Sequence, residues 1–535
     1  MLSYRKLAMR VLGRPLHTEG IDSPRPASQR AAAFILTAAM LTTLAAPAFA
    51  DIWHIENGDI TISAGESGNN VTQNNNTTYG DTNTIITNQN KDTASSHTVT
   101  IEAKDKDDKV EVTLKDVNID TSSRNKAAVS VTGEGDTNIK LDGDNALKSD
   151  IYRSGIYGSG SLTISGGEND SLTAQGGSGA NGISSSGSLT ISGGTVTANG
   201  DDGGRGISSS GSVTISGGST VTANGGSGTI SGGDGIWSGG GVTISGGSTV
   251  TANGGNGGSL VGGDSIRSGG GLTVSDGTVT AKGGNGDSKD GYGGDGIRSG
   301  GVVTISGNTV NAAGGYGGKV GGYGICSFDR VAISGGTVEA AGGNGSTGGG
   351  SGIYSSVIDL SGSLELTAKA GSPNGKALSQ KGSELVLDTI KDKLGPGAKV
   401  TATDADGKVI DQVSTPRPVE PEESSSSSDG GSAAPSAPAS PLPGLTVTDK
   451  DGQRISYTST QSGNTLTVCV GRLTASFRIS LAALRQLRAE GIETITFQTT
   501  LCSTTLSVDE LLAMGGEDAE AVLTHRFTDS SLTVG

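Results

Sequence analysis

The sequence contains few of the residues that fill an ordinary globular core. Aromatic residues make up 3% of the chain, and only two tryptophans occur among its 535 residues. A large aromatic-filled core is therefore excluded. Three cysteines, Cys326, Cys469 and Cys502, are too few for a disulfide scaffold, and their spacing leaves open whether Cys469 and Cys502 pair.

Histidine is equally scarce, and the four that occur lie far apart in the sequence. This separation argues against a histidine-dependent nucleophile or a histidine metal site. Glycine-rich strings abound, but none follows a strand and opens a helix, as a nucleotide-binding loop requires. Beyond the N-terminus the chain also lacks an apolar run of 18 residues.

The first 50 residues have the character of an export signal. A basic lead precedes the apolar run "AAAFILTAAMLTTLAAPAFA", which ends in Ala48-Phe49-Ala50. This pattern predicts a signal peptide over residues 1–50, cleaved before Asp51, because the run is too short and too rich in alanine to favour the alternative, a membrane anchor.

The net charge of the whole chain is −16, and residues 1–50 hold six basic residues against two acidic ones. The mature protein is therefore more acidic still, and its surface repels nucleic acid and anionic lipid. We expect a secreted or cell-surface protein with no nucleic-acid partner and no membrane insertion after signal removal.

Glycine is the residue that the sequence has in excess, with 92 copies, and it accompanies a repeat. Isoleucines that follow a glycine or serine recur every 24 to 31 residues, and each begins a short three-residue pattern. They are Ile156, Ile183, Ile207, Ile236, Ile266, Ile297, Ile325 and Ile353. A second apolar pair follows six residues after each of the first seven, and a third short pattern contains Val or Leu two residues before Ala.

Three short strands per repeat, broken by Gly, Ser, Asn or Asp, predict a solenoid. Such strands cannot stand alone, but stacking in parallel closes a narrow Ile/Val/Ala core. The fold class expected is all-β: a right-handed parallel β-helix with three faces per coil, plus a small C-terminal α+β domain. Glycines are expected at corners that need positive φ or that bring adjacent coils close together. Serine stands two residues after seven of the eight isoleucines. These serines and the Asn199, Asn224 and Asn253 series are expected to form hydrogen bonds along the stack.

Composition divides the rest of the chain. Residues 51–97 are expected to form an N-terminal cap with a polar loop, because an open solenoid end is an unpaired strand edge. The β-helix is predicted over 98–413. Residues 414–444 hold 7 of the 13 prolines and predict a Pro/Ser-rich linker. Residues 445–535 predict the α+β domain, with helices in "SLAALRQLRAEG" and "SVDELLAMGG".

The segment Val110 to Leu147, followed by "GIYGSGSLTISGG", resembles the carbohydrate-binding β-helix domains exported by anaerobic Gram-positive bacteria. The pattern that carries the resemblance is Val112-Thr113-Leu114, Val117, Ile119, Ala127-Ala128-Val129, Ile139, Leu141 and Asn145. The resemblance covers residues 98 to about 380. The resemblance implies a non-catalytic polysaccharide binder of the pectate- or cellulose-binding type, whose ligands include acidic plant cell-wall glycans, with calcium as a structural ion. This chain departs from the pattern in its glycine content and longer corners.

One outward position of the repeat carries large side chains. In Gly-Ile-x-Ser the isoleucine points inward, so x points outward. Along the stack x reads Tyr157, Ser184, Ser208, Trp237, Arg267, Arg298, Cys326 and Tyr354. Trp237, Arg267 and Arg298 are the candidate ligand-binding residues, with a cation–π contact expected between Trp237 and Arg267. The alternative is an exposed ring that covers a neighbouring loop. Insertions before the isoleucines place longer loops beside this position.

Asp234, Asp264 and Asp295 stand two residues before three successive stacked isoleucines. Carboxylates one coil apart repel each other. We expect them either to turn into solvent or to hold a cation, and as the candidate metal ligands they are assigned to calcium.

These features together favour an exported, non-enzymatic polysaccharide-binding β-helix protein. A structural or adhesive cell-surface stalk is the alternative. A polysaccharide lyase is third, because β-helices host such enzymes, but the sequence offers no supported acid–base pair.

Overall fold

The computed structural model describes residues 51–416 and, towards the C-terminus, 444–448, 454–455, 457–462, 464–470, 475–499, 503–516, 519–525 and 530–534. The chain divides into two compact units, one up to Pro421 and one from Glu422. The predicted signal peptide and most of the predicted linker lie outside the described residues. Within the described part, no helix is long and apolar enough to span a membrane.

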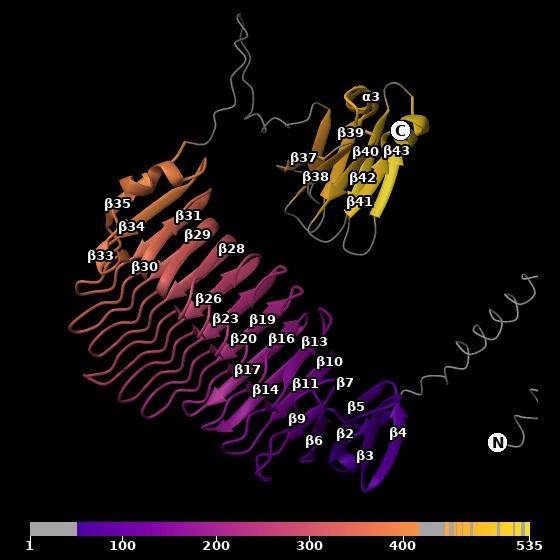
Figure 1. Ribbon diagram of the computed structural model, residues 1–535, viewed down its shortest axis with the longest axis vertical. Helices are drawn as coiled ribbons and strands as arrows, with labels where there is room; N and C mark the ends of the chain where they lie inside the picture. Colours follow the sequence, from indigo (N-terminus) through magenta and orange to yellow (C-terminus); the bar gives the residue numbers. More distant parts are fainter. Residues whose placement is uncertain are drawn as a thin grey trace, which may run out of the picture. The chain divides into compact units, whose positions relative to one another are not determined.

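The N-terminal unit is a parallel β-solenoid of about 13 turns, and the structure has 54% strand and 6% helix. Figure 1 shows its strands stacked in columns along one axis, with long loops emerging from one side of the coils. The predicted all-β class and three-faced parallel β-helix are confirmed.

The first face contains the stacked isoleucines, each paired in parallel with its equivalent on the next coil. Its strands are β2 (Ile60–Gly65), β6 (Val99–Ala103), β9 (Val129–Gly133), β12 (Ile156–Gly158), β15 (Ile183–Ser185), β18 (Ile207–Ser209), β21 (Ile236–Ser238), β24 (Ile266–Ser268), β27 (Ile297–Ser299), the first residues of β29 (Ile325–Ala341) and β30 (Ile353–Leu360), and β32 (Leu378–Gln380).

The second face carries the apolar pairs predicted six residues further on. Its strands are β1 (Ile52–His54), β5 (Thr84–Thr87), β7 (Lys109–Lys115), β10 (Asp136–Asp142), β13 (Ser161–Ser165), β16 (Leu189–Ser192), β19 (Val213–Ser216), β22 (Val242–Ile244), β25 (Leu272–Val274), the first residues of β28 (Val303–Ala313), the central part of β29 and the last residues of β30.

The third face completes each coil. Its strands are β8 (Asn118–Asp120), β11 (Asp144–Lys148), β14 (Ser171–Ser178), β17 (Thr195–Asp201), β20 (Thr220–Asn224), β23 (Ser248–Asn253), β26 (Gly277–Lys282), the last residues of β28 and β29, β31 (Leu364–Lys369) and β34 (Lys399–Thr403).

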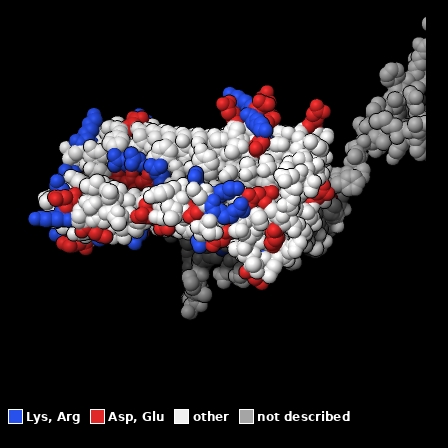
Figure 2. All heavy atoms as spheres, turned by 90° about the horizontal axis from the view of Figure 1, so that it is seen from below, with Lys and Arg blue, Asp and Glu red and all other residues white. Residues whose placement is uncertain are grey.

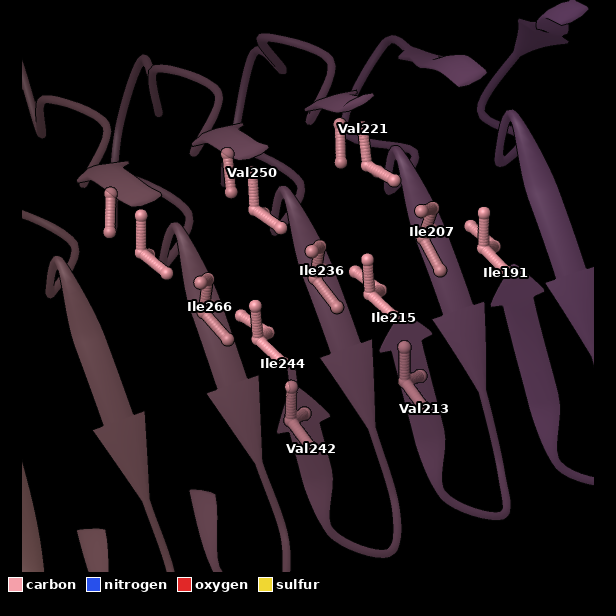
Figure 3. Close-up of a cluster of buried hydrophobic side chains, with 14 of the residues drawn as sticks. Ile191, Ile207, Val213, Ile215, Val221, Ile236, Val242, Ile244, Val250 and Ile266 are labelled. Carbon is pink, nitrogen blue, oxygen red and sulfur yellow. The ribbon is translucent and has the colours of Figure 1, made fainter. Parts of the chain in front are cut away.

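Equivalent apolar residues meet on successive coils and form the core. Ile236 pairs with Ile207 on one side and Ile266 on the other, and all three side chains are fully buried. Figure 3 shows these rows pointing into the interior from each face. Because the same residue types recur at the same positions, the core is a set of aliphatic columns, and large aromatic side chains are not needed to fill it.

The N-terminal end departs from the expected loop. The Asn/Thr-rich segment forms β3 (Gly68–Gln73) and β4 (Asn76–Asp81), which continue β2 as an antiparallel meander. Asn69 and Gln73 are buried and donate hydrogen bonds to main-chain carbonyls of neighbouring segments. The solenoid also begins earlier than residue 98, because β1, β2 and β5 already pair in parallel with later coils. Polar side chains thus form the cap by hydrogen bonding to the open end, which an apolar pattern does not reveal.

The far end is closed near the predicted place. The 3-10 helix η2 (Leu387–Lys393) buries Leu387 and Ile390 against the last coil, as the short η1 (Ile55–Asn57) buries Ile55 near the first. β33 (Ser383–Glu384) and β35 (Val409–Ser414) pair antiparallel with β32 and β34. These antiparallel pairings end the parallel stack.

Glycine has two separate roles in the solenoid. The "SGG" corners between the second and third faces hold glycines with positive φ, as expected; Gly246 and Gly247 have φ of 63° and 72°. Most glycines of the long loops need no positive φ. They lie so close to the preceding coil that a Cβ on Gly263 or Gly294 would meet the carbonyl oxygen of the equivalent glycine before it.

These loop glycines form a hydrogen-bonded ladder. Gly255 donates its N–H to Gly233 on the preceding coil, Gly263 donates to Gly255 across its own loop, and the pattern continues with Gly284 and Gly294 at 2.8–2.9 Å. The outgoing and returning arms of each loop therefore pack at main-chain distance. The excess of glycine is explained chiefly by this close packing.

Polar columns follow the same register. The Ser209 and Ser238 hydroxyls donate to main-chain carbonyls of the preceding coil at 2.8 and 2.9 Å. The Asn253 side chain donates to Asn224, and Asn224 to Asn199, each at 2.8 Å. The expected hydrogen-bonded series along the stack are confirmed.

The C-terminal unit is a small α+β fold, as predicted. One sheet contains β36 (Leu445–Thr448), β39 (Ala475–Ser480), β42 (Glu520–His525) and β43 (Ser530–Val534). The other contains β37 (Thr458–Ser462), β38 (Thr465–Cys469), β40 (Thr494–Gln498) and β41 (Ser503–Ser507). Helices α3 (Leu481–Ala489) and α4 (Val508–Met514) are capped by Ser480 and Ser507. Cys502 lies outside the described residues.

The packing role of the loop glycines gives a first prediction. We expect Gly294→Ala to destabilise the solenoid by about 1–3 kcal/mol, because its Cβ would overlap the carbonyl of Gly263. Thermal unfolding of the full chain measures the effect. Gly348→Ala is the matched control: it lies in an equivalent loop, its Cβ would make only ordinary contacts with Val320 at 3.8 Å, and it should change stability by less than about 0.5 kcal/mol. Equal effects of the two substitutions would contradict the packing role.

Candidate functional site

The predicted outward strip, the x positions from Tyr157 to Tyr354, lies along the first face. Trp237 pairs in register with Arg267, and Arg267 with Arg298, on adjacent coils. In β21, β24 and β27 these residues lie between a buried isoleucine and a buried serine, so the three predicted ligand-binding residues share one face. The alternation of side chains in short strands was sufficient to place them.

A wall of main chain stands beside the strip. It consists of the returning arms of the glycine-rich loops, and we call it the glycine wall: Gly204, Gly233, Gly263, Gly293 and Gly322. The loop insertions therefore lie where the sequence placed them, next to the outward strip. Between wall and strip runs a groove of about 800 Å³, the C-terminal groove, which extends over the coils from Asn181 to Tyr323.

The aspartates lie at the base of this groove, in a hydrogen-bonded series that we call the aspartate ladder: Asp234, Asp264 and Asp295. Each Oδ1 accepts the main-chain N–H of the residue at the same position one coil later, at 2.9, 2.7 and 2.7 Å, the last from Tyr323. Their residue exposures are only 7%, 7% and 3%. The expectation that the carboxylates turn into solvent is wrong, because coil stacking presents a main-chain donor to each of them.

An arginine lies beside each of these carboxylates. Arg205 Nε is 3.2 Å from Asp234 Oδ2, and Arg298 Nη1 is 3.0 Å from Asp295 Oδ2. Arg267 Nη1 is 3.8 Å from Asp264 Oδ2, and its side chain is 49% exposed. Arg267 is therefore the most weakly held of the three and the most available to a ligand.

Burial changes the acidity of the ladder. Desolvation, followed by repulsion from Asp295 and Asp234, raises the pKa of Asp264 to about 7. Desolvation also raises the pKa of Asp295, although the N–H of Tyr323 and the Arg298 guanidinium oppose it. The Asp264 carboxyl therefore gains or loses its proton near neutral pH.

The partner of Trp237 differs from the one expected. The Arg205 guanidinium lies over the indole ring at 4.5 Å from its centroid, although Arg267 is the neighbour in strand register. Arg205 stands two residues before Ile207, at the position that the aspartates occupy in later coils, and its side chain reaches across to both Asp234 and Trp237. The cation–π prediction was right in type and wrong in partner, and the half-buried Trp237 borders the groove without lining it.

At the far end the groove has an aromatic border that the sequence did not single out. Tyr323 and Tyr354 stack at 4.9 Å, and Arg298 lies 5.1 Å from the Phe328 ring centroid. Cys326 occupies an outward position of the strip but is only 1% exposed, and burial raises the pKa of its thiol to about 12. Tyr323 stands two residues before a stacked isoleucine, as each aspartate of the ladder does. This shared spacing was the signal in the sequence that could have identified Tyr323.

A second hollow continues the groove towards the N-terminus. This N-terminal hollow, also about 800 Å³, shares Gly179 and Asn181 with the C-terminal groove and extends back to Thr98. Its floor is formed by outward hydroxyl residues of the first face, and Lys126, Arg153 and two tyrosines border it. Together the two hollows follow one edge of the solenoid over about nine coils, from β6 to β29.

Charged side chains are unevenly distributed over the surface. Figure 2 shows one face of the molecule, on which uncharged residues predominate and basic side chains gather in a few clusters beside acidic ones. Among the described residues, no group of three or more His, Cys, Asp and Glu side chains is arranged to hold a metal ion. The assignment of Asp234, Asp264 and Asp295 to calcium stays a prediction.

The N-terminal hollow and the C-terminal groove together form one continuous hollowed surface along the β-solenoid, which we call its open edge. Comparison of the chain with protein-family models, with curated proteins and with solved structures gives no match.

The raised pKa of Asp264 gives a second prediction. An acid whose pKa is raised on folding costs no stability below its unfolded pKa, near 3.9, and costs progressively more as pH rises to the folded value. We expect Asp264→Asn to raise the free energy of unfolding at pH 8 by on the order of a few kcal/mol and to have little effect at pH 4, as measured by unfolding of the full chain at both pH values. The asparagine keeps an oxygen that accepts the Asp295 N–H.

Asp276→Asn is the control, because Asp276 is exposed and lies outside both hollows. It should change the free energy of unfolding by less than about 0.5 kcal/mol at either pH. A larger gain for Asp264→Asn at pH 4 than at pH 8 would show that the buried carboxylate is not the cause.

Calcium binding by the aspartate ladder is a third prediction. If the ladder binds calcium, millimolar calcium should raise the unfolding midpoint and a chelator should lower it, because a bound ion stabilises the folded state by RT ln(1 + [L]/Kd). The Asp234→Asn variant serves as the control and should lose the difference. Equal midpoints with calcium and chelator would leave the arginines as the only counter-ions of the ladder.

Proposed function

We propose that this protein is an exported, non-catalytic polysaccharide-binding protein whose ligand lies along the open edge of the solenoid. The observation that carries the proposal is the continuous pair of hollows, each about 800 Å³, between the outward positions of the first face and the loops that precede it. A site that runs over many equivalent coils suits a repeating linear ligand better than a compact one.

The dimensions of the fold agree with such a ligand. Each coil advances by one strand spacing, about 4.8 Å. This rise is close to the length of one sugar ring along an extended polysaccharide, so successive rings would meet successive coils. When sugar rings and coils repeat at the same spacing, the same contact between a ring and a coil can form several times along the groove.

The chemistry of the groove also fits sugars. Arg267 is half exposed and loosely paired, and Tyr292 and Tyr323 line the groove and offer ring faces beside polar groups. Hydroxyl groups of a sugar bind to such donors, and aromatic faces stack on the ring. Trp237 supports this surface from its border by holding Arg205 in place.

Binding without cleavage is proposed because the acidic groups of the groove are already engaged. Each carboxylate of the aspartate ladder accepts a main-chain N–H, and an arginine lies beside each one. A glycan-cleaving enzyme needs a positioned acid–base pair or a base beside the sugar. The alternative of a structural or adhesive stalk is favoured by the stiffness that stacked coils give, but it gives no role to the paired hollows.

The proposal predicts selective retention on a glycan array. The full chain should bind one class of linear polysaccharide, and Arg267→Gln should weaken binding about tenfold, because a charge-assisted hydrogen bond contributes roughly 1.5–3 kcal/mol. Trp237→Ala should weaken it as well while costing under about 1 kcal/mol of stability. Affinity and the unfolding midpoint are measured on the same preparations.

Arg330→Gln is the matched control, because Arg330 is an exposed arginine outside both hollows. It removes the same charge and should leave affinity unchanged. Absence of binding to any glycan favours the stalk. Release of unsaturated or reducing ends during incubation would identify an enzyme instead.

A further inference from the structure

We propose that the N-terminal hollow is a subsite for an anionic sugar, which takes the carboxylate of a uronate-type residue between Arg153 and Lys126. The inference rests on the proposed function and specifies which part of the open edge recognises charge. It places this recognition away from Arg267 and Arg298, the arginines that the sequence indicated.

The N-terminal hollow is positively charged. The described residues that line the hollow include Lys126 and Arg153 and no carboxylate. The whole chain carries a net charge of −16, so a basic hollow departs from the surface around it. An anion approaching this edge is therefore attracted at this place and repelled over most of the molecule.

The positive charge around the hollow is only partly compensated by carboxylates. Asp59 is the shared partner of Arg124 at 2.8 Å, Lys126 at 3.1 Å and His97 at 3.2 Å. Burial would raise the pKa of Asp59, but hydrogen bonds from Arg124, the N–H of Thr98, Lys126 and His97 hold it well below its usual range. The Asp59 carboxylate is thus the shared partner of two permanently charged side chains, Arg124 and Lys126, and of His97.

Arg153 has no such partner in the described part of the chain. It is exposed, and its Nε donates to the Asn125 side chain at 3.3 Å, which leaves both Nη groups without a carboxylate within ion-pair distance. The three arginines of the C-terminal groove differ, since each of them lies within 4 Å of an aspartate. A guanidinium with free Nη donors is suited to bidentate binding of a carboxylate.

The shape of the N-terminal hollow also suits one charged sugar. The floor of the hollow is made of small hydroxyl residues, Thr100, Ser130 and Thr132, which keep it open and offer hydrogen bonds. Tyr157 and Tyr152 border it with side chains that are 44% and 78% exposed. A ring face beside a free guanidinium and a row of hydroxyls can accept one charged sugar with its ring stacked and its other hydroxyls bonded.

The test compares two probes that differ only in charge: an oligogalacturonate and the same oligosaccharide after its carboxyl groups are reduced to alcohols. Calorimetry on the full chain measures both affinities. We expect the acidic probe to bind at least about tenfold more tightly, and Arg153→Gln to remove about tenfold of its affinity while leaving the neutral probe within about twofold.

Lys140→Gln provides the control, because Lys140 is exposed on neighbouring β10 and lies outside both hollows. It should leave both affinities unchanged. An equal loss for both probes with Arg153→Gln, no loss for either, or an equal loss with Lys140→Gln would each overturn the subsite. If the native chain binds neither probe nor any other glycan, the proposed function itself fails, whereas binding of the neutral probe with an unaffected Arg153→Gln variant removes only the subsite.

Discussion

The structure depends on one constraint, the parallel stacking of coils one strand spacing apart. Every residue then lies beside its equivalent on the coils before and after it, about 4.8 Å away. At a position that is packed between coils, a residue is tolerated only if it can be repeated at that distance. Isoleucine columns satisfy this by packing, serine and asparagine columns by hydrogen bonding, and the loop glycines by having no side chain at all. The monotony of the sequence is the consequence.

The same constraint creates the charged chemistry of the groove. Three stacked aspartates would repel each other strongly if nothing intervened. Stacking also aligns a main-chain N–H from the next coil with each carboxylate, and Arg205, Arg267 and Arg298 lie on the open side. The ladder is therefore held inside the edge of the solenoid with a raised pKa at Asp264, and the arginines divide into tightly and loosely paired ones.

The open edge results from variation within the repeat. The second apolar pair keeps its spacing of six residues from the isoleucine of the first face, and most changes in repeat length enter the loops that precede the first face. These loops lie in register because their glycines allow main-chain contact, as the ladder through Gly233, Gly255 and Gly263 shows. A regular wall of backbone next to a strip of varied side chains provides a constant shape on one side and selectivity on the other.

The sequence by itself determined the parallel β-helix, the composition of its three faces, the outward position of Trp237, Arg267 and Arg298, and the α+β character of the C-terminal unit. These features follow from local alternation and from a repeat that the chain states many times. It did not determine the strands within the polar cap, the burial of the aspartates, the contact of Arg205 with Trp237, or the excess of positive charge around Arg153. Those depend on which main-chain donors and long side chains from other coils reach a given position, and such distances between coils are set only when the chain has stacked.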